Sequence, residues 1–298
     1  MTKSKLFLST ETPGRFLHHP ATKAWLGQFD EKYQVTAADL LGAVRLVSRD
    51  AFVTDLRLLI AQRIAEGPGP IGLYAEREIR KTRGIPNAIF QRTRAKCSRA
   101  VGDGPVPVEP TRAYNPDVGS EGIVAHLITE LCRSHGRKAL YHPGPDEIRK
   151  KKVRRFILVT DLIGTGNRAF NYLQAAWKVE TIKSWRSLGL MQFEVVAYAA
   201  TADGLKKVRL HRCRPRVEIV APCPTINSVF SGKKQALMED MCVRYDPVDN
   251  DPVDSLGYGG QGCLIAFGHG VPNNAPRILH RGVEKKKKKW AALFPARV

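Results

Sequence analysis

The sequence predicts an α/β fold, with a parallel sheet flanked by helices and a helical subdomain before it. Residues 156–159 form a continuous apolar run, which is typical of a strand buried on both faces. A small polar turn at 164–167 follows it, and apolar residues then recur at helical spacing. Further strand-like runs alternate with helical patterns, at 71–75, 193–200 and 217–221. This alternation favours parallel strands joined by right-handed crossovers.

The segment before the sheet reads as two helices in residues 1–66. We expect Thr36 to cap the first helix, and Val44 and Val47 to continue its apolar face after Leu40 and Leu41. The second helix carries apolar residues at core spacing, namely Phe52, Leu56, Leu59 and Ile60. We expect these helices to form a cap packed against the sheet.

The domain boundaries follow from these patterns. Gly and Pro alternate at 67–70, which separates a helical cap at 1–66 from an α/β domain at 67–282. Residues 283–298 form a basic tail with five consecutive lysines followed by Trp290. Most such tails are solvated, although Trp290 could stack on a single nucleic acid strand.

Composition restricts the partners. The formal net charge is +20, which favours polyanions such as nucleic acid, nucleotides or an acidic protein. Six cysteines occur without a Cys-x-x-Cys pair, so we expect buried thiols in a reducing cytoplasm rather than zinc or disulfides. No apolar run is long enough for a membrane span, so we expect a soluble, cytoplasmic protein without a membrane partner.

The central turn predicts an anion site. A strand, a glycine turn and a helix in this order direct backbone N–H groups and a helix N-terminus at one point. Asp161 comes just before the turn, at the carboxyl edge of the strand, where ligands bind in open α/β sheets. The alternative is an ordinary strand–turn–helix corner without a ligand.

A second helix entrance begins at Gly119 and Ser120, and Ser120 resembles an N-cap. It is a second candidate for anion binding, and an ordinary capped helix is the alternative.

The candidate nucleic-acid contacts are basic residues in two stretches. One precedes the central strand at its amino end, away from the predicted anion site, and the other lies within residues 77–99. The residues are Lys150, Lys151, Lys152, Arg154, Arg155, Arg92 and Arg94. A solvated linker or face is the alternative reading.

The last region combines glycine with hydrogen-bonding side chains. An apolar strand at 263–267 is followed by His269, Asn273 and Asn274. The amides could bind a base or ribose, and His269 could act as an acid or base near neutral pH. Turn formation alone would also explain the Gly, Pro and Asn content.

Residues 156–168 resemble the signature of the type I phosphoribosyltransferases. In that family an acidic pair contacts the ribose of phosphoribosyl pyrophosphate (PRPP), and a Thr-Gly loop wraps its 5′-phosphate. The resemblance implies that Asp161 is the second acidic residue, and that it binds ribose with Mg²⁺ as a cofactor. The phosphate loop would comprise Gly164, Thr165, Gly166, Asn167 and Arg168. Thr160 replaces the first acidic residue, and Arg168 replaces a small hydroxyl residue.

Features along most of the chain resemble one group, the conflict-associated phosphoribosyltransferase-like proteins of bacterial anti-phage defence loci. They include Gly119-Ser120-Glu121-Gly122, the central motif, Gly257-Tyr258-Gly259, and His269 with Pro272-Asn273-Asn274. This resemblance implies a type I phosphoribosyltransferase fold and a role as a defence effector. It also implies partners, such as a retron reverse transcriptase or another defence protein, and oligomerisation is compatible with it.

Three functions remain open. The first is an effector that binds PRPP or a related nucleotide and acts on nucleotides or nucleic acid, with Asp161 and His269 as catalytic candidates. In it Gly119 and Ser120 would hold pyrophosphate, and Asn273 and Asn274 would contact the base. The second is a degenerate site within a scaffold that binds DNA or RNA or senses a nucleotide. The third, a base-salvage enzyme, fits the charge and the incomplete motif least well.

Overall fold

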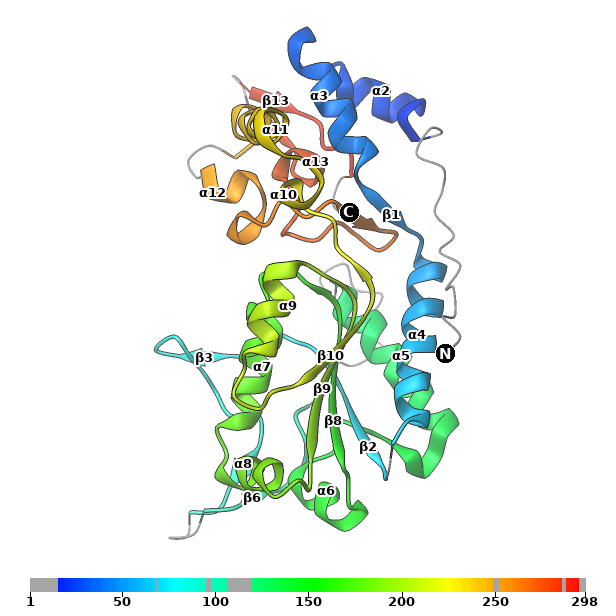
Figure 1. The fold of residues 1–298 in the computed structure, drawn as a ribbon, viewed down its shortest axis with the longest axis vertical. Helices are drawn as coiled ribbons and strands as arrows, with labels where there is room; N and C mark the ends of the chain where they lie inside the picture. Colours follow the sequence, from blue (N-terminus) through cyan, green and yellow to red (C-terminus); the bar gives the residue numbers. More distant parts are fainter. Residues whose placement is uncertain are drawn as a thin grey trace. The chain divides into compact units, whose positions relative to one another are not determined.

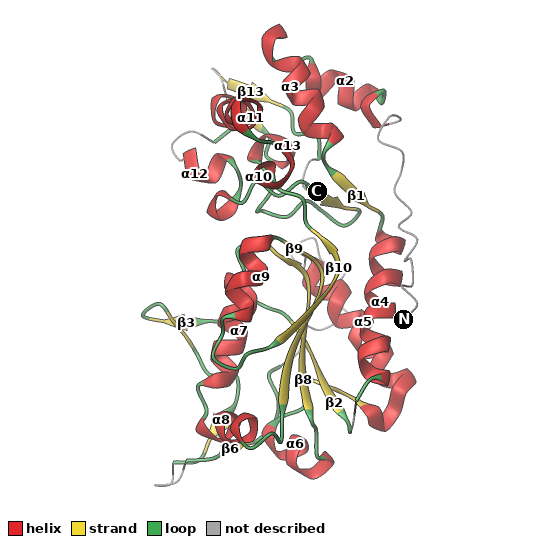
Figure 2. Cartoon of the chain, viewed as in Figure 1, coloured by secondary structure: helices red, strands yellow, loops and turns green. Residues whose placement is uncertain are grey.

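The computed structural model describes residues 16–67, 69–94, 98–106, 119–248, 252–285 and 288–294 (Figures 1 and 2). The chain forms two compact units, which are described separately. The sheet unit is Thr54–Pro222, and the terminal unit joins Met1–Val53 to Cys223–Val298. Within the described part of the chain, no helix combines the length and apolarity that a membrane crossing requires.

A five-stranded parallel sheet forms the centre of the sheet unit. The order of the strands across the sheet is β10-β9-β8-β2-β7. The first strand along the chain, β2, therefore lies between the second, β7, and the third, β8, which is a doubly wound order. The strands are β2 (Ile71–Ala75), β7 (Ala139–Tyr141), β8 (Arg155–Ile163), β9 (Gln192–Ala200) and β10 (Arg216–Pro222). This confirms the predicted α/β class and the predicted strands.

Helices cover both faces of the sheet (Figure 1). On one face lie α4 (Arg49–Ala65), whose residues from Thr54 onward belong to this unit, and α5 (Gly119–His135). On the other face lie α7 (Asn167–Trp177), α8 (Glu180–Ser187) and α9 (Ala202–Arg209). The short helix α6 (Pro145–Lys151) leads into β8. Two hairpins complete the unit, β3 (Lys81–Thr82) with β4 (Ile85–Pro86), and β5 (Gln91–Arg92) with β6 (Ala100–Val101).

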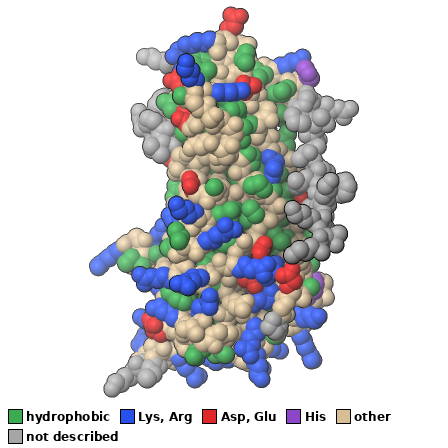
Figure 3. Space-filling model, in the orientation of Figure 1, with side chains coloured by type: hydrophobic (Ala, Val, Ile, Leu, Met, Phe, Trp, Pro, Cys, Tyr) green, Lys and Arg blue, Asp and Glu red, His purple; other side chains and the backbone are tan. Residues whose placement is uncertain are grey.

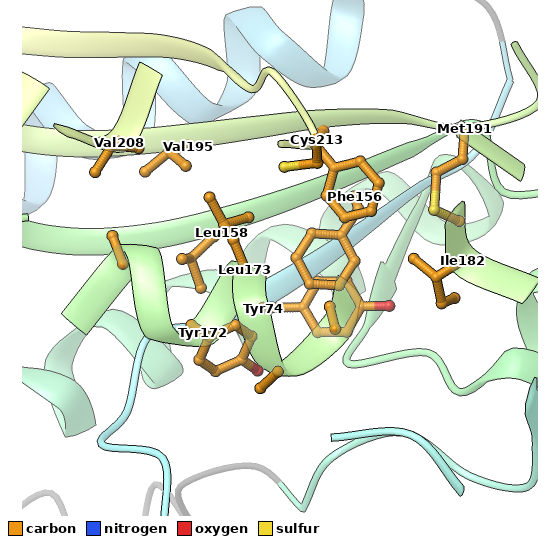
Figure 4. Packing of buried hydrophobic residues seen from close by; sticks show 14 of the residues in the cluster. Tyr74, Phe156, Leu158, Tyr172, Leu173, Ile182, Met191, Val195, Val208 and Cys213 are labelled. Carbon is orange, nitrogen blue, oxygen red and sulfur yellow. The ribbon is translucent and has the colours of Figure 1, made fainter. Parts of the chain in front are cut away.

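The core between the sheet and α7 is rich in aromatic side chains (Figure 4). Tyr74 of β2 stacks on Phe156 of β8, with ring centroids 3.9 Å apart. Leu173 and Tyr172 of α7 are fully buried in the same cluster. The apolar run that predicted a strand buried on both faces is therefore buried as expected, and it fixes the position of the turn that follows it.

The terminal unit is built from both ends of the described chain. Its helices are α2 (Pro20–Leu26), α3 (Glu31–Gly42), α10 (Ile226–Val229), α11 (Gly232–Arg244), α12 (Pro252–Ser255), η3 (Tyr258–Gly260) and α13 (Arg277–His280). Its strand pairs are β1 (Arg45–Val47) with β11 (Ile265–Phe267), and β12 (Val283–Lys285) with β13 (Lys288–Trp290). Trp25, Phe29 and Trp290 meet in its core.

Two predictions about the first helices are wrong. Helix α3 begins at Glu31, so Thr36 lies inside the helix and is buried rather than at the cap. Val44 and Val47 lie beyond the end of that helix, and Val47 belongs to β1, where it pairs with Phe267. A strand partner more than two hundred residues away along the chain determines this conformation, and local periodicity cannot reveal it.

The two units divide the chain differently from the boundaries expected at residues 66 and 282. Helix α4 contacts the sheet through the ion pair of Arg63 with Glu194 of β9, whereas α2 and α3 pack against the C-terminal segment. Trp290 is also not a solvated stacking residue: its indole is buried, and its Nε1 donates to the Ile278 carbonyl at 2.9 Å. Burial of large apolar rings explains both differences, because these aromatic residues cover one another.

Candidate functional site

The site is located where the strand order reverses. Strands β2 and β8 are neighbours in the sheet but are separated along the chain by β7, and ligands of doubly wound sheets bind beyond the carboxyl ends of such a pair. Glu76 directly follows β2, and Thr160 and Asp161 belong to the last part of β8. Polar side chains from both strands therefore gather at this edge.

Glu76 and Thr160 are brought together by the register of the sheet. Ala75 is paired with Val159, and the Glu76 amide donates to the Val159 carbonyl at 2.8 Å. The Thr160 hydroxyl donates to Glu76 Oε2 at 2.6 Å. Glu76 is only 4% exposed, and its burial raises its pKa to about 7, although Arg168 and Thr160 favour the charged form.

Arg168 connects this carboxylate to a second one. Its Nε lies 3.5 Å from Glu76 Oε2, and its guanidinium is also ion-paired with Glu121 in the first turn of α5. Burial is the main cause that raises the pKa of Glu121. Carboxyl groups with raised pKa values in one place are typical of functional sites. The sequence pattern had singled out Arg168 but neither Glu76 nor Glu121 as a site residue.

Asp161 is half-buried beside this group. Its Oδ1 accepts the Leu162 amide at 2.7 Å and lies 3.3 Å from the Thr160 hydroxyl. In the described residues, no group of three or more His, Cys, Asp or Glu side chains could hold a metal ion alone. Mg²⁺ commonly binds through one or two carboxylates together with substrate phosphates and water, so Asp161 fits a metal that a phosphorylated ligand completes.

The glycine loop has the features expected of a phosphate site. Gly166 adopts φ 74°, which favours glycine, and α7 begins directly after it. The Thr165 hydroxyl accepts the Asn167 amide at 3.3 Å. The amides of Thr165 and Gly166 have no hydrogen-bond partner within the described ranges. Two unpaired amides at the start of a helix can bind an anion.

The start of α9 holds this loop in place. The Thr201 hydroxyl donates to the Gly164 carbonyl at 2.7 Å and accepts the Gly204 amide at 2.9 Å. A Cβ at Gly204 would lie 2.2 Å from the Gly164 carbonyl oxygen, so only glycine fits there. Lys207 of the same helix donates to the Asn167 side chain. The loop is therefore preorganised by the neighbouring strand-to-helix turn.

The second helix entrance lies next to the first. The structure describes α5 from Gly119, so Ser120 is a helical residue rather than the predicted N-cap. The ion pair between Arg168 and Glu121 brings the first turns of α7 and α5 together. Both turns predicted for anion binding therefore meet at one edge of the sheet.

The remaining predicted ligand residues belong to the terminal unit. The Asn274 side-chain amide donates to the Tyr258 carbonyl at 2.9 Å, and Asn274 is buried, so it stabilises the adjacent turn. Asn273 is exposed, and its carbonyl accepts the Tyr258 amide. The His269 ring stacks on Phe267 and contacts Phe52 edge to face. The structure thus brings Asp161 together with the glycine loop in one unit, whereas His269, Asn273 and Asn274 belong to the other.

The prediction that Arg155 contacts nucleic acid is wrong. This side chain is 3% exposed and pairs with Glu194 of β9, and its Nη1 donates to the Arg63 carbonyl at 2.6 Å. It compensates a buried carboxylate instead of presenting charge to a partner. The other predicted basic residues are exposed, namely Lys150, Lys151, Lys152, Arg154, Arg92 and Arg94.

A five-stranded doubly wound sheet with a glycine loop and carboxylates at its switch point defines an α/β protein and is consistent with a type I phosphoribosyltransferase-like fold. The family model of PRTase-CE, the conflict-associated phosphoribosyltransferases, matches residues 22–296. The chain belongs to this family, which supports a phosphoribosyltransferase-like function. The comparison with curated proteins gave no match.

The missed residue Glu76 had a usable signal in the sequence. It directly follows the predicted strand 71–75, and the carboxyl ends of parallel strands meet at one edge. Its proximity to Thr160 depends on which strands are neighbours, and the residue pattern does not state that order. Glu121 lies forty residues upstream of Asp161, and only the packing of α5 and α7 reveals its role.

Proposed function

We propose that the carboxyl edge of the sheet unit binds PRPP, or a related phosphoribosyl nucleotide, together with Mg²⁺. The observation that carries this proposal is the position of Asp161 beside a helix-entrance loop whose Thr165 and Gly166 amides are unpaired, at the switch point of the sheet. Binding at this point would satisfy both amides and the carboxylate.

Each part of the site has a chemical role in this proposal. The amides of Thr165 and Gly166 would hold the 5′-phosphate, and Asp161 would accept hydrogen bonds from ribose hydroxyls and hold the metal. Bound Mg²⁺ would neutralise pyrophosphate charge. Phosphoribosyl transfer passes through a positively charged sugar, so fixed carboxylates near the ribose stabilise charge separation.

In its finer form the proposal is that the protein acts as an effector of a bacterial anti-phage system, with a retron as one setting. Membership of the conflict-associated family and the net charge of +20 support this role. The acceptor would then be a nucleotide or nucleic acid, because a basic surface attracts such substrates.

The test is titration calorimetry of PRPP with Mg²⁺ into wild type and Asp161→Asn, both freed of nucleic acid. We expect binding by wild type and a loss of about tenfold or more in the variant, because a charged hydrogen bond and a metal ligand are removed. Asp203→Asn, an exposed residue of α9, is the matched control and should bind as wild type does. Absence of binding by folded wild type would contradict the proposal.

A second function, a nucleic-acid-binding scaffold, is favoured by a separate observation. Lys150, Lys151, Lys152 and Arg154 are all exposed at the amino end of β8, the opposite end of that strand from the glycine loop. Figure 3 shows Lys and Arg side chains gathered over the sheet unit. Phosphate contacts from such residues bind nucleic acid independently of sequence.

A further inference from the structure

We infer that Glu76 supplies the carboxylate that the phosphoribosyl motif lacks at position 160, so that the ribose of the ligand is held by Glu76 and Asp161 from two adjacent strands. This inference rests on the proposed PRPP-binding function and assigns it a ligand-binding residue that lies far from the motif along the chain. Thr160 is then a positioning residue that orients Glu76.

The register of the sheet is the first argument. Glu76 continues β2 by one residue, and its amide still bonds to β8 through the Val159 carbonyl. It therefore lies directly across from Thr160, the position at which the related motif carries an acid. A carboxylate on the neighbouring strand reaches the same edge of the sheet, because side chains at paired positions of parallel strands point to the same face.

The hydrogen bond between the two side chains is the second argument. The Thr160 hydroxyl donates to Glu76 Oε2 at 2.6 Å, a short distance typical of a charge-assisted bond. Thr160 is itself 2% exposed, so this bond is shielded from water. An acid at position 160 would face Glu76 at close range, and mutual repulsion would disfavour two carboxylates there. The replacement of the acid by threonine is thus consistent with the presence of Glu76.

The third argument is that one oxygen of the Glu76 carboxylate remains available to accept a hydrogen bond from a ligand. Thr160 and Arg168 both contact Oε2, and Oε1 has no partner in the part of the chain that is described. Because Oε1 is not among the fully buried unpaired atoms, it keeps some exposure to solvent and can accept a hydrogen bond from a ligand. Ribose hydroxyls can supply that bond, and Asp161 Oδ1 lies 3.3 Å from the same Thr160 hydroxyl.

The experiment compares PRPP–Mg²⁺ affinity in wild type, Glu76→Gln, and the double variant Glu76→Gln with Thr160→Asp. We expect Glu76→Gln to weaken binding about tenfold, and the double variant to regain most of the loss because it returns a carboxylate to the motif position. Glu78→Gln, which removes an exposed carboxylate two residues away, is the matched control and should leave affinity unchanged. Circular dichroism and thermal melting verify the fold of each variant.

The outcomes separate this inference from the function on which it rests. If Asp161→Asn loses binding while Glu76→Gln binds as wild type, the inference is overturned and the PRPP site stands. Loss in Glu76→Gln without recovery in the double variant also overturns it, because Glu76 would then be structural only. If wild type fails to bind, both are overturned.

Should Glu76→Gln not fold, Glu76→Asp provides the test. It keeps the charge but shortens the side chain by one methylene, so it draws the carboxylate away from Thr160. We expect an affinity clearly below that of wild type, and equal affinities would contradict the inference.

Discussion

His142 illustrates how single side chains hold the edge of the sheet. It follows β7, is 5% exposed, and its Nε2 accepts the Ala75 amide of β2 at 2.9 Å. An imidazole that accepts a hydrogen bond at this nitrogen is neutral there. Burial lowers the pKa of His142 to about 4, in agreement with that geometry. The hydrogen bond from the Ala75 amide to the titratable ring of His142 therefore fixes the backbone immediately before Glu76.

This arrangement predicts a pH dependence of stability. The folded-state pKa of His142 lies below its ordinary value near 6.5, so its contribution is complete above pH 6.5 and is lost as pH falls toward 4. We expect the free energy of unfolding to fall by roughly 1 kcal/mol between pH 7 and 5.5 from this group. Urea unfolding of wild type and His142→Gln at both values measures it. The variant should lose that part of the pH dependence, whereas His126→Gln, at an exposed position, should keep it.

At the scale of elements, the glycine loop between β8 and α7 depends on its neighbour α9. Gly164, Gly166 and Gly204 approach so closely that a Cβ at Gly166 would lie 2.8 Å from the Gly204 carbonyl oxygen. The contact between the β8–α7 turn and the β9–α9 turn has no room for a larger residue. The glycines of the motif thus have a packing role in addition to exposing amides.

The prediction at this scale concerns Gly204→Ala. Its new Cβ would lie 2.2 Å and 2.7 Å from the carbonyl oxygens of Gly164 and Ile163, and backbone atoms cannot yield without moving the loop. We expect a loss of about 1–3 kcal/mol in the free energy of unfolding and weaker PRPP binding. Urea unfolding and calorimetry measure the two effects. Gly42→Ala, where a Cβ meets nothing within 4 Å, is the control, and equal behaviour of the two variants would contradict this packing role.

At the scale of the whole molecule, the basic residues behind the net charge of +20 differ in burial and in pairing. The guanidinium groups of Arg155 and Arg63 form buried ion pairs with Glu194. Lys150, Lys151 and Arg154 are exposed. Only exposed basic residues of this kind can neutralise the phosphates of a nucleic-acid partner.

The salt dependence of nucleic-acid binding tests this distribution. We expect the affinity of wild type for a single-stranded oligonucleotide to fall linearly on a log–log plot against salt. Replacing Lys150, Lys151 and Arg154 by Gln should make the slope shallower by about 2, because fewer counterions are released. The matched variant replaces Lys23, Lys32 and Lys233, exposed bases of the terminal unit, and should retain the slope. Fluorescence anisotropy gives the affinities, and a flat slope in wild type argues against nucleic acid as a partner.

The sequence by itself determined four of the five strands of the sheet, the central motif and the family resemblance. An apolar run at 156–159 can only be buried, and a glycine turn before a helix presents amides wherever it occurs, so both follow from local chemistry. The predicted cap at Thr36 failed because an intrinsic capping preference is weak compared with the packing of α3 on its neighbours.

Only the tertiary structure decided how distant segments combine. It placed Glu76 against Thr160, joined Arg168 to Glu121, and buried Arg155 with Glu194 and Trp290 with Trp25. Each of these contacts depends on strand order or on the packing of segments distant along the chain, which no local pattern encodes. The physical reason is that burial and pairing are properties of a side chain's surroundings. The same residue type is therefore exposed at Arg154 and forms a buried ion pair at Arg155.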